Sequence, residues 1–295
     1  MSKYFNSKRQ FGIEIEFLLP RWEELDPIAV TSPKLGLSLW IDPQEIPDWG
    51  TERPYNEVSD WKLTTDSSVE NGDGSVGFEI NSRILQGESS LSELAIILEH
   101  LNKYNALVDE QCGLHVHIEI RNNFSETQIK NLLKLQLNLE DAFDSLINPE
   151  RRRGNIYCKS NLNPFYSELC EGSTISVDPA IWTDTSRASL VSRSFQFLDE
   201  AEQQTMQMMA AGSLFHKMNI SPFFTCGTVE IRSHHGTLDY AEIVNWIALQ
   251  MALVETAYSA SQIEPETLFF VGTQKAFTVL EANLNENVIQ YYLNR

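Results

Sequence analysis

Three segments of the chain alternate apolar residues with charged or imidazole side chains, and this alternation limits the possible folds more than any other feature. The segments are residues 11–17 with Glu14 and Glu16, residues 113–119 with His115 and His117, and residues 228–234 with Glu230 and Arg232. Because residues two apart share one face of a β-strand, each segment predicts a strand with one apolar and one polar face. A solvated sheet face usually carries Lys, Thr, Ser and Gln, so Glu, His and Arg indicate the inner wall of a catalytic cleft.

Hydrophobic periodicity, turn residues and helix caps predict the remaining elements. Strands are expected at residues 10–19, 61–67, 75–81, 112–121, 216–221 and 227–233. Helices are expected to begin at Ser89 or Ser90, to run from Ser125 to about residue 147, to cover residues 198–211, and to follow the cap Asp239, with two short helices at the end. Strands that cluster with helices between them predict an α+β fold around an antiparallel sheet.

The 295 residues show no repeat or break in composition that forces two domains, so one domain over residues 1–295 is expected. Residues 20–60 are rich in Pro, Trp, Asp and Glu with weak periodicity, which predicts a variable excursion or a lid. Residues 233–237 are expected to form a polar turn, and residues 240–295 a C-terminal helical part.

Composition limits the partners that the protein can have. The formal net charge is −19, from 22 Lys and Arg against 41 Asp and Glu, which disfavours binding to nucleic acid by phosphate neutralisation. Four scattered cysteines without C-x-x-C spacing indicate reduced thiols and no disulfide framework. The polar first ten residues lack the apolar core of a signal peptide, and no stretch is apolar enough to span a membrane, so a soluble, cytoplasmic protein is expected.

The acidic and imidazole side chains of the alternating strands are candidate ligands of a metal or a phosphate. Two glutamates buried in an apolar strand would cost several kcal/mol without a counter-charge. Hard cations such as Mg²⁺ or Mn²⁺ prefer such oxygen ligands. Glu79 is another acid within an apolar strand, and Asp66 ends the strand next to it.

Structural explanations exist for each of these residues. A lone Glu can lie at a sheet edge, a His can be structural, Asp66 can cap a turn, and Glu230 with Arg232 can form a simple ion pair. The paired histidines also suit a cupin or an amidohydrolase, but Glu119 is too near and Glu126 too far for the cupin pattern. Walker A, G-x-S-x-G and H-E-x-x-H motifs are absent from the sequence, so an acyl-serine or zincin mechanism has no support.

The ordered set of motifs resembles the amidoligase family of the carboxylate–amine ligase superfamily, which includes glutamine synthetase and glutamate–cysteine ligase. The motifs that carry the resemblance, over residues 8–256, are Gly12 to Phe17, Asp66-Ser67, Phe78 to Ile80, Cys112 to His117, Val229 to Ser233 and Gly236 to Asp239. The resemblance implies a curved antiparallel sheet that holds ATP and Mg²⁺ on its concave face. Where the family often has Ser-Pro after the Glu79 strand, this chain has Asn81-Ser82-Arg83.

The resemblance also implies roles for individual residues. The metal ligands would be Glu14, Glu16, Glu79, His115 and Glu230. The candidate catalytic residues are Arg232, His117 and Asp66, of which Arg232 and His117 would contact the phosphates of ATP. The candidate substrate-binding residues are Arg153, Asn155, Tyr157, Lys217, Asn219 and Arg83.

The expected activity is therefore that of an ATP- and Mg²⁺-dependent (or Mn²⁺-dependent) ligase. It would join a carboxylate to an amine on a small molecule, peptide or protein side chain, through an acyl phosphate. The alternatives are a metal-dependent phosphotransferase or hydrolase that uses the same cleft, and a non-catalytic descendant that binds a nucleotide or peptide. The sequence indicates neither the identity of the two substrates nor the oligomeric state.

Overall fold

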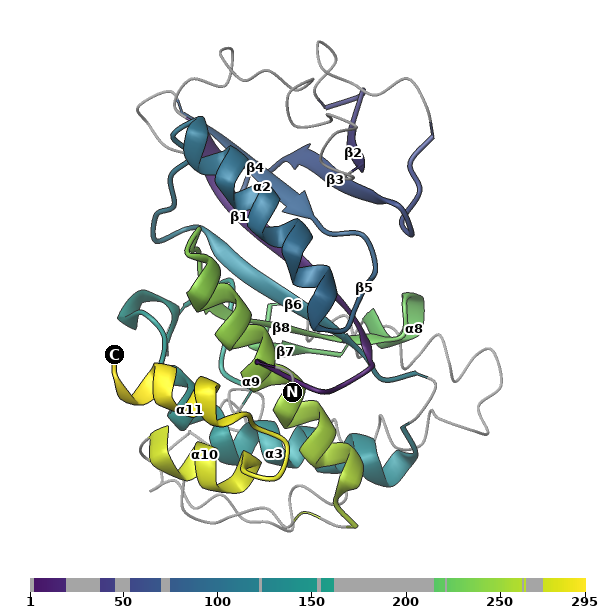
Figure 1. The fold of residues 1–295 in the computed structure, drawn as a ribbon, viewed down its shortest axis with the longest axis vertical. Helices are drawn as coiled ribbons and strands as arrows, with labels where there is room; N and C mark the ends of the chain where they lie inside the picture. The colour runs from purple at the N-terminus through teal and green to yellow at the C-terminus, as the bar shows by residue number, and fades with distance from the viewer. Residues whose placement is uncertain are drawn as a thin grey trace, which may run out of the picture.

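The fold is an α+β arrangement in which helices cover a mostly antiparallel sheet (Figure 1). The computed structural model describes residues 3–19, 38–45, 54–69, 75–121, 124–152, 155–161, 215–220, 222–261, 263 and 273–295. Within these residues the eight strands are β1 (Gln10–Leu19), β2 (Ser38–Ile41), β3 (Asp60–Thr65), β4 (Val76–Asn81), β5 (Leu85–Gln86), β6 (Gly113–Glu119), β7 (Met218–Asn219) and β8 (Thr228–His235).

The alternating segments lie side by side in the middle of the sheet. The strand order is β2-β3-β4-β1-β6-β8-β7, and the short β5 also pairs with β1. All neighbours are antiparallel except β2 and β3, which are parallel. The sequence therefore predicted the α+β class with an antiparallel sheet correctly, and the parallel pairing of β2 with β3 at one edge is a feature that it did not predict.

The apolar face of the sheet forms the core together with the helices. On β1, Phe11, Ile13, Ile15 and Phe17 are almost fully buried. The helices of the described residues are α2 (Leu91–Lys103), α3 (Glu126–Asp144), α8 (Pro222–Thr225), α9 (Tyr240–Ser259), α10 (Thr273–Leu280) and α11 (Glu286–Leu293), with short 3-10 turns at η3 (Glu88–Ser90) and η4 (Pro149–Arg151). Helices α2 and α9 cross the sheet on this side, and α3, α10 and α11 gather beside α9 (Figure 1).

Helix caps confirm two of the expected helix starts. Ser125 and Gln128 form a capping box at the start of α3. The Asp239 carboxylate accepts a hydrogen bond from the Glu242 backbone N–H at 3.1 Å, at the start of α9. A cap of this kind stabilises a helix by about 1 kcal/mol. None of the helices in the described parts of the chain has the length and apolar character needed to cross a membrane.

Two predicted segments differ from the structure, and one lies outside it. The described part of residues 20–60 contains β2, which extends the sheet because its backbone pairs with β3. Residues 233–235, expected in a turn, continue β8 instead. One extra residue in β8 opposite Leu114 to Val116 shifts the register, which turns His234 to the apolar face beside Leu114. The helix expected at residues 198–211 lies outside the described residues.

Candidate active site

The polar side chains of the central strands are brought together by the register of the sheet. On one side of β1, Glu16 pairs with Glu79. On the other side, Glu14 pairs with His115, and the next strand places Glu230 opposite His117. Directly opposite residues lie on the same face of a sheet, so these six side chains share the face that α2 and α9 leave uncovered.

Glu14, His117 and Glu230 form the first group of potential ligands, with ligand atoms all within 4.8 Å of one another. His117 Nε2 lies 2.9 Å from Glu14 Oε1 and 4.0 Å from Glu230 Oε1. The nearby His115 Nδ1 lies 3.0 Å from Glu14 Oε2 and 3.6 Å from Glu230 Oε1. The arrangement offers both carboxylate and imidazole ligands to one cation.

Glu16, Asp66 and Glu79 form the second group, again with ligand atoms within 4.8 Å. Asp66 is held at the end of β3 because its N–H donates to the Gly77 carbonyl at 2.8 Å. Gly77 permits this approach, since a Cβ there would lie only 2.4 Å from the Asp66 carbonyl oxygen. The structure thus brings Asp66 to two of the predicted metal ligands.

His115 connects the two groups. Its Nε2 lies 3.4 Å from Glu16 Oε1, whereas its Nδ1 faces Glu14. The imidazole is 2% exposed, and Nε2 makes no hydrogen bond within the described residues. Glu16 is in turn fixed by the Gly113 backbone N–H, which donates to Oε2 at 2.6 Å.

The carboxylates repel one another where no cation offsets their charge. Burial raises the pKa of Glu79 to about 7, and the charges of Glu14 and Glu16 add to this rise. Burial also opposes ionisation of Glu14, but hydrogen bonds from His115 and His117 outweigh it and hold the pKa of Glu14 well below its usual range. Crowded carboxylates with an unsatisfied buried imidazole nitrogen are a donor set that fits Mg²⁺ or Mn²⁺.

His117 also faces a cysteine at the edge of the cleft. Burial would lower the pKa of His117, but hydrogen bonds to Cys226 and Glu14 raise it to about 10. The bond from His117 lowers the pKa of the Cys226 thiol to about 7. Thr228 completes this contact, with Oγ1 3.1 Å from His117 Nδ1 and 3.2 Å from the sulfur.

Arg232 and Asn219 lie next to the first group. Arg232 Nη1 contacts the Glu230 carboxylate and lies 3.5 Å from His115 Nδ1. Asn219 Nδ2 donates to Glu230 Oε2 at 2.6 Å. A guanidinium beside acidic ligands can bind an oxyanion held by the same cations.

Four of the residues expected to bind substrate do not join this cluster. Lys217 is fully buried against Asp144, at 2.5 Å, and Glu140, at 3.5 Å. Arg83 pairs with Glu93 of α2 at 2.5 Å.

Asn155 and Tyr157, which were also expected to bind substrate, belong to a turn, and the predicted Arg153 is not among the described residues. Asn155 closes the turn, since its side-chain oxygen accepts from the N–H groups of Tyr157 and Cys158. Tyr157 is 37% exposed.

Sequence reasoning missed three residues at the site: Asn81, Cys226 and Arg151. Asn81 donates to Glu79 Oε1 at 2.5 Å, and the alternation in β4 could have revealed it. Cys226 carries no pattern that marks it. The run Arg151 to Arg153 hints at an anionic substrate but is also typical of a solvated surface, and the sequence alone does not show that Arg151 is buried, at 1% exposed.

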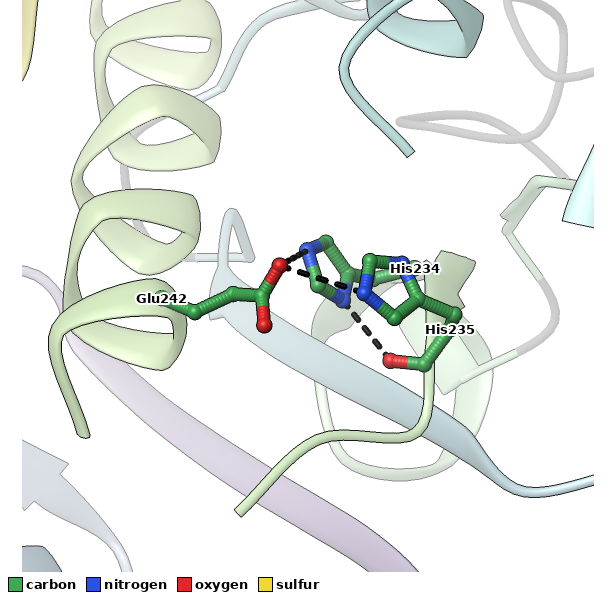
Figure 2. A group of neighbouring side chains, drawn as sticks. All are labelled: His234, His235 and Glu242. Atoms are coloured by element: carbon green, nitrogen blue, oxygen red, sulfur yellow. Dashed lines mark hydrogen bonds and ion pairs between the residues drawn. The ribbon is translucent and has the colours of Figure 1, made fainter. Parts of the chain in front are cut away.

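A separate group lies on the opposite, helix-covered side of the sheet (Figure 2). His235 Nε2 lies 3.1 Å from Glu242 Oε1, and His234 Nε2 lies 3.9 Å from the same atom. Thr237 donates to Glu242 Oε2 at 2.7 Å, and Arg295 also contacts this carboxylate. Because Thr237, His235 and Arg295 all contact the Glu242 carboxylate, the group links the end of β8 to α9.

The family comparison supports the chemistry that the first two groups suggest. The sequence model of the family described as "Putative amidoligase enzyme" matches residues 7–254, which include every predicted metal ligand. No curated protein matches the chain. The match assigns the chain to a family of ligase-type enzymes.

Proposed function

The chain belongs to this amidoligase family, and we propose that it is an ATP- and Mg²⁺-dependent carboxylate–amine ligase. It would form an amide or isopeptide bond through an acyl-phosphate intermediate. The observation that carries the proposal is the junction at His115, where two groups of carboxylates, Glu14 with Glu230 and Glu16 with Glu79, meet on one face of the sheet. Such a junction suits two divalent cations that bind the same polyphosphate.

The chemistry requires activation of the acid. A carboxylate is a poor acylating agent in water, because its charge repels nucleophiles and oxide is a poor leaving group. Attack of a carboxylate oxygen on the γ-phosphorus breaks the bond to ADP and gives an acyl phosphate. The ammonium first loses one proton to solvent, and the free amine nitrogen then attacks the acyl carbon. The bond to phosphate breaks, phosphate leaves, and the nitrogen loses a second proton to solvent as the amide forms.

The residues of the cleft would act mainly by positioning and charge stabilisation. Glu14, Glu16, Asp66, Glu79, His115 and Glu230 would hold the cations. When bound, the cations would neutralise the charge of the phosphates. Arg232 would bind the transferred phosphoryl group through its planar fork of donors, and His117 would contact the phosphates beside it.

Titration calorimetry of ATP with and without Mg²⁺ tests the nucleotide part of the proposal. We expect Mg²⁺-dependent binding by the wild type, and its loss in Glu16→Gln, which removes one charge from the second group. Glu99→Gln makes the same chemical change on the exposed side of α2 and should bind as the wild type does. A wild type that binds no ATP would refute the ligase mechanism.

An assay of ADP production distinguishes the ligase from its alternatives. Candidate acids and amines include amino acids, peptides, cell-wall fragments and proteins with free side chains. ADP that forms only when both an acid and an amine are present identifies a ligase. ATP consumption without them identifies a hydrolase, and binding without ADP identifies a nucleotide-binding descendant.

A further inference from the structure

Arg151, at the end of η4, carries a buried charge that no carboxylate of the described residues contacts directly. Its side chain is 1% exposed. Nη2 donates to the Arg232 carbonyl at 3.1 Å, and Nε has no hydrogen-bond partner. Within the described residues, no carboxylate forms an ion pair with this guanidinium. A buried guanidinium without a direct ion pair is unfavourable, so this arginine indicates an anion that is not part of the chain.

The buried Lys217 provides a comparison within the same protein. It is as inaccessible as Arg151, but its ammonium contacts both Asp144 and Glu140. The charge of Lys217 is therefore balanced inside the protein, as expected for a structural ion pair. Arg151 departs from this pattern, although acidic residues are common throughout the chain.

The guanidinium of Arg151 lies over Gly113, at the centre of the cleft. A Cβ at Gly113 would lie 2.7 Å from Arg151 Nη2, 2.9 Å from His115 Nε2 and 3.2 Å from Glu16 Oε2. The missing side chain of Gly113 therefore makes the space in which the arginine reaches His115. This is the point where the two groups of candidate metal ligands meet.

We infer that Arg151 is a second phosphoryl-binding residue, which contacts the γ-phosphoryl group of ATP as it passes to the acid. This inference rests on the proposed ligase function. A transferred phosphoryl group spreads negative charge over three oxygens, and its site needs more than one donor. Arg232 Nη1 lies 3.5 Å from His115 Nδ1, and Arg151 Nη2 lies near the other ring nitrogen of His115, above Gly113. Both guanidinium groups therefore border the same imidazole, where one phosphoryl group could contact the two of them.

The test compares two nucleotides that differ by the γ-phosphoryl group. Calorimetry with Mg²⁺ measures the affinity of ADP and of the non-hydrolysable β,γ-imido analogue of ATP. In Arg151→Met, which keeps the length and removes the charge, we expect the affinity for the analogue to fall about ten- to hundredfold. The affinity for ADP should remain within about twofold. Arg151→Lys, which keeps the charge but not the fork, should lie between the wild type and Arg151→Met.

Arg152→Met is the matched control, because Arg152 donates from Nε and Nη2 to the Ile147 carbonyl and not to the cleft. It should bind both nucleotides as the wild type does. The assignment of Arg151 would be overturned if the two Arg151 variants lost affinity for ADP and for the analogue equally, or if their affinity for the analogue were unchanged. Either result would leave the ligase proposal standing. Failure of the wild type to bind either nucleotide would overturn both.

Discussion

Glu14 and His115 face each other across the central strands β1 and β6, with Oε2 and Nδ1 3.0 Å apart. Each also contacts a further part of the cleft. Glu14 reaches His117, and His115 reaches Glu16. The pair therefore connects the two groups of carboxylates, and a change at His115 should affect both groups.

Replacement of His115 should weaken both cation sites. We expect His115→Ala to lower the affinity of each of two Mn²⁺ ions by about ten- to hundredfold, a loss typical of a removed metal contact. Glu230→Gln, which changes only the first group, should lower the affinity for one of the two ions. Electron paramagnetic resonance of free Mn²⁺ gives the number and affinity of the sites. Two unaffected ions in His115→Ala would contradict the role of His115 as the junction.

Metal binding should depend on pH through Glu79. Burial and the neighbouring carboxylates raise its pKa to about 7, so in the metal-free protein the group binds a proton below this pH. A cation must displace that proton, and its affinity should rise between about pH 5 and 7 and then level off. Calorimetry of Mn²⁺ binding in buffers of different ionisation enthalpy measures the released proton. In Glu79→Gln the proton release should disappear.

The same shift affects the stability of the metal-free protein. The pKa of Glu79 is higher in the folded state than in the unfolded state. The contribution of Glu79 to the free energy of unfolding is therefore fully present below about pH 4.5 and is lost as the pH rises through about 7. The loss is about 3 kcal/mol at most. Urea unfolding at several pH values with a chelator present should show this decrease, and Glu79→Gln should flatten it.

His234 should affect the pH dependence of stability in the opposite direction from Glu79. Burial lowers its pKa to about 3, so the folded state holds the imidazole neutral while the unfolded state binds a proton below about pH 6.5. Stability from this group is present above pH 6.5 and is lost as the pH falls towards 3. In His234→Phe, which keeps a ring against Trp246, the unfolding free energy should change less between pH 7 and 4.5. An identical pH dependence in the two proteins would contradict this prediction.

Removal of the Lys217 charge should destabilise the protein. In Lys217→Met the buried carboxylate of Asp144 loses this ion pair, and loss of one partner from such a pair costs about 3–5 kcal/mol. The double variant Lys217→Met, Asp144→Leu should recover part of the loss. Urea unfolding measures both, and Lys103→Met on the exposed end of α2 is the control. A loss below about 1 kcal/mol would show that water reaches the pair.

Much of the fold followed from the sequence because β1, β4, β6 and β8 show a two-residue period. That period also identified most of the polar face, including Glu14 and His115. It could not predict the parallel pairing of β2, since pairing depends on contacts distant in sequence. It also placed the end of β8 wrongly, because a register shift leaves no local signal.

The two-residue period of the strands could not predict the burial of Arg151 either, because Arg151 lies outside the strands. A run of arginines usually lies in solvent, and only the tertiary fold shows that one member turns inward over Gly113. Lys217 was expected at the site but lies elsewhere, whereas Arg151 lies at the site unexpectedly. Two carboxylates of α3 hold Lys217 in a buried ion pair.

The extra residue in β8 has a consequence for how this chain can vary. Before it, Glu230 faces the cleft; after it, His234 faces Trp246 of α9. Insertion of one further residue between them would reverse the side that His234 faces and turn it out of the core. Substitutions should therefore be tolerated here far more readily than single-residue insertions, and we expect added residues only in the connections on either side of β8.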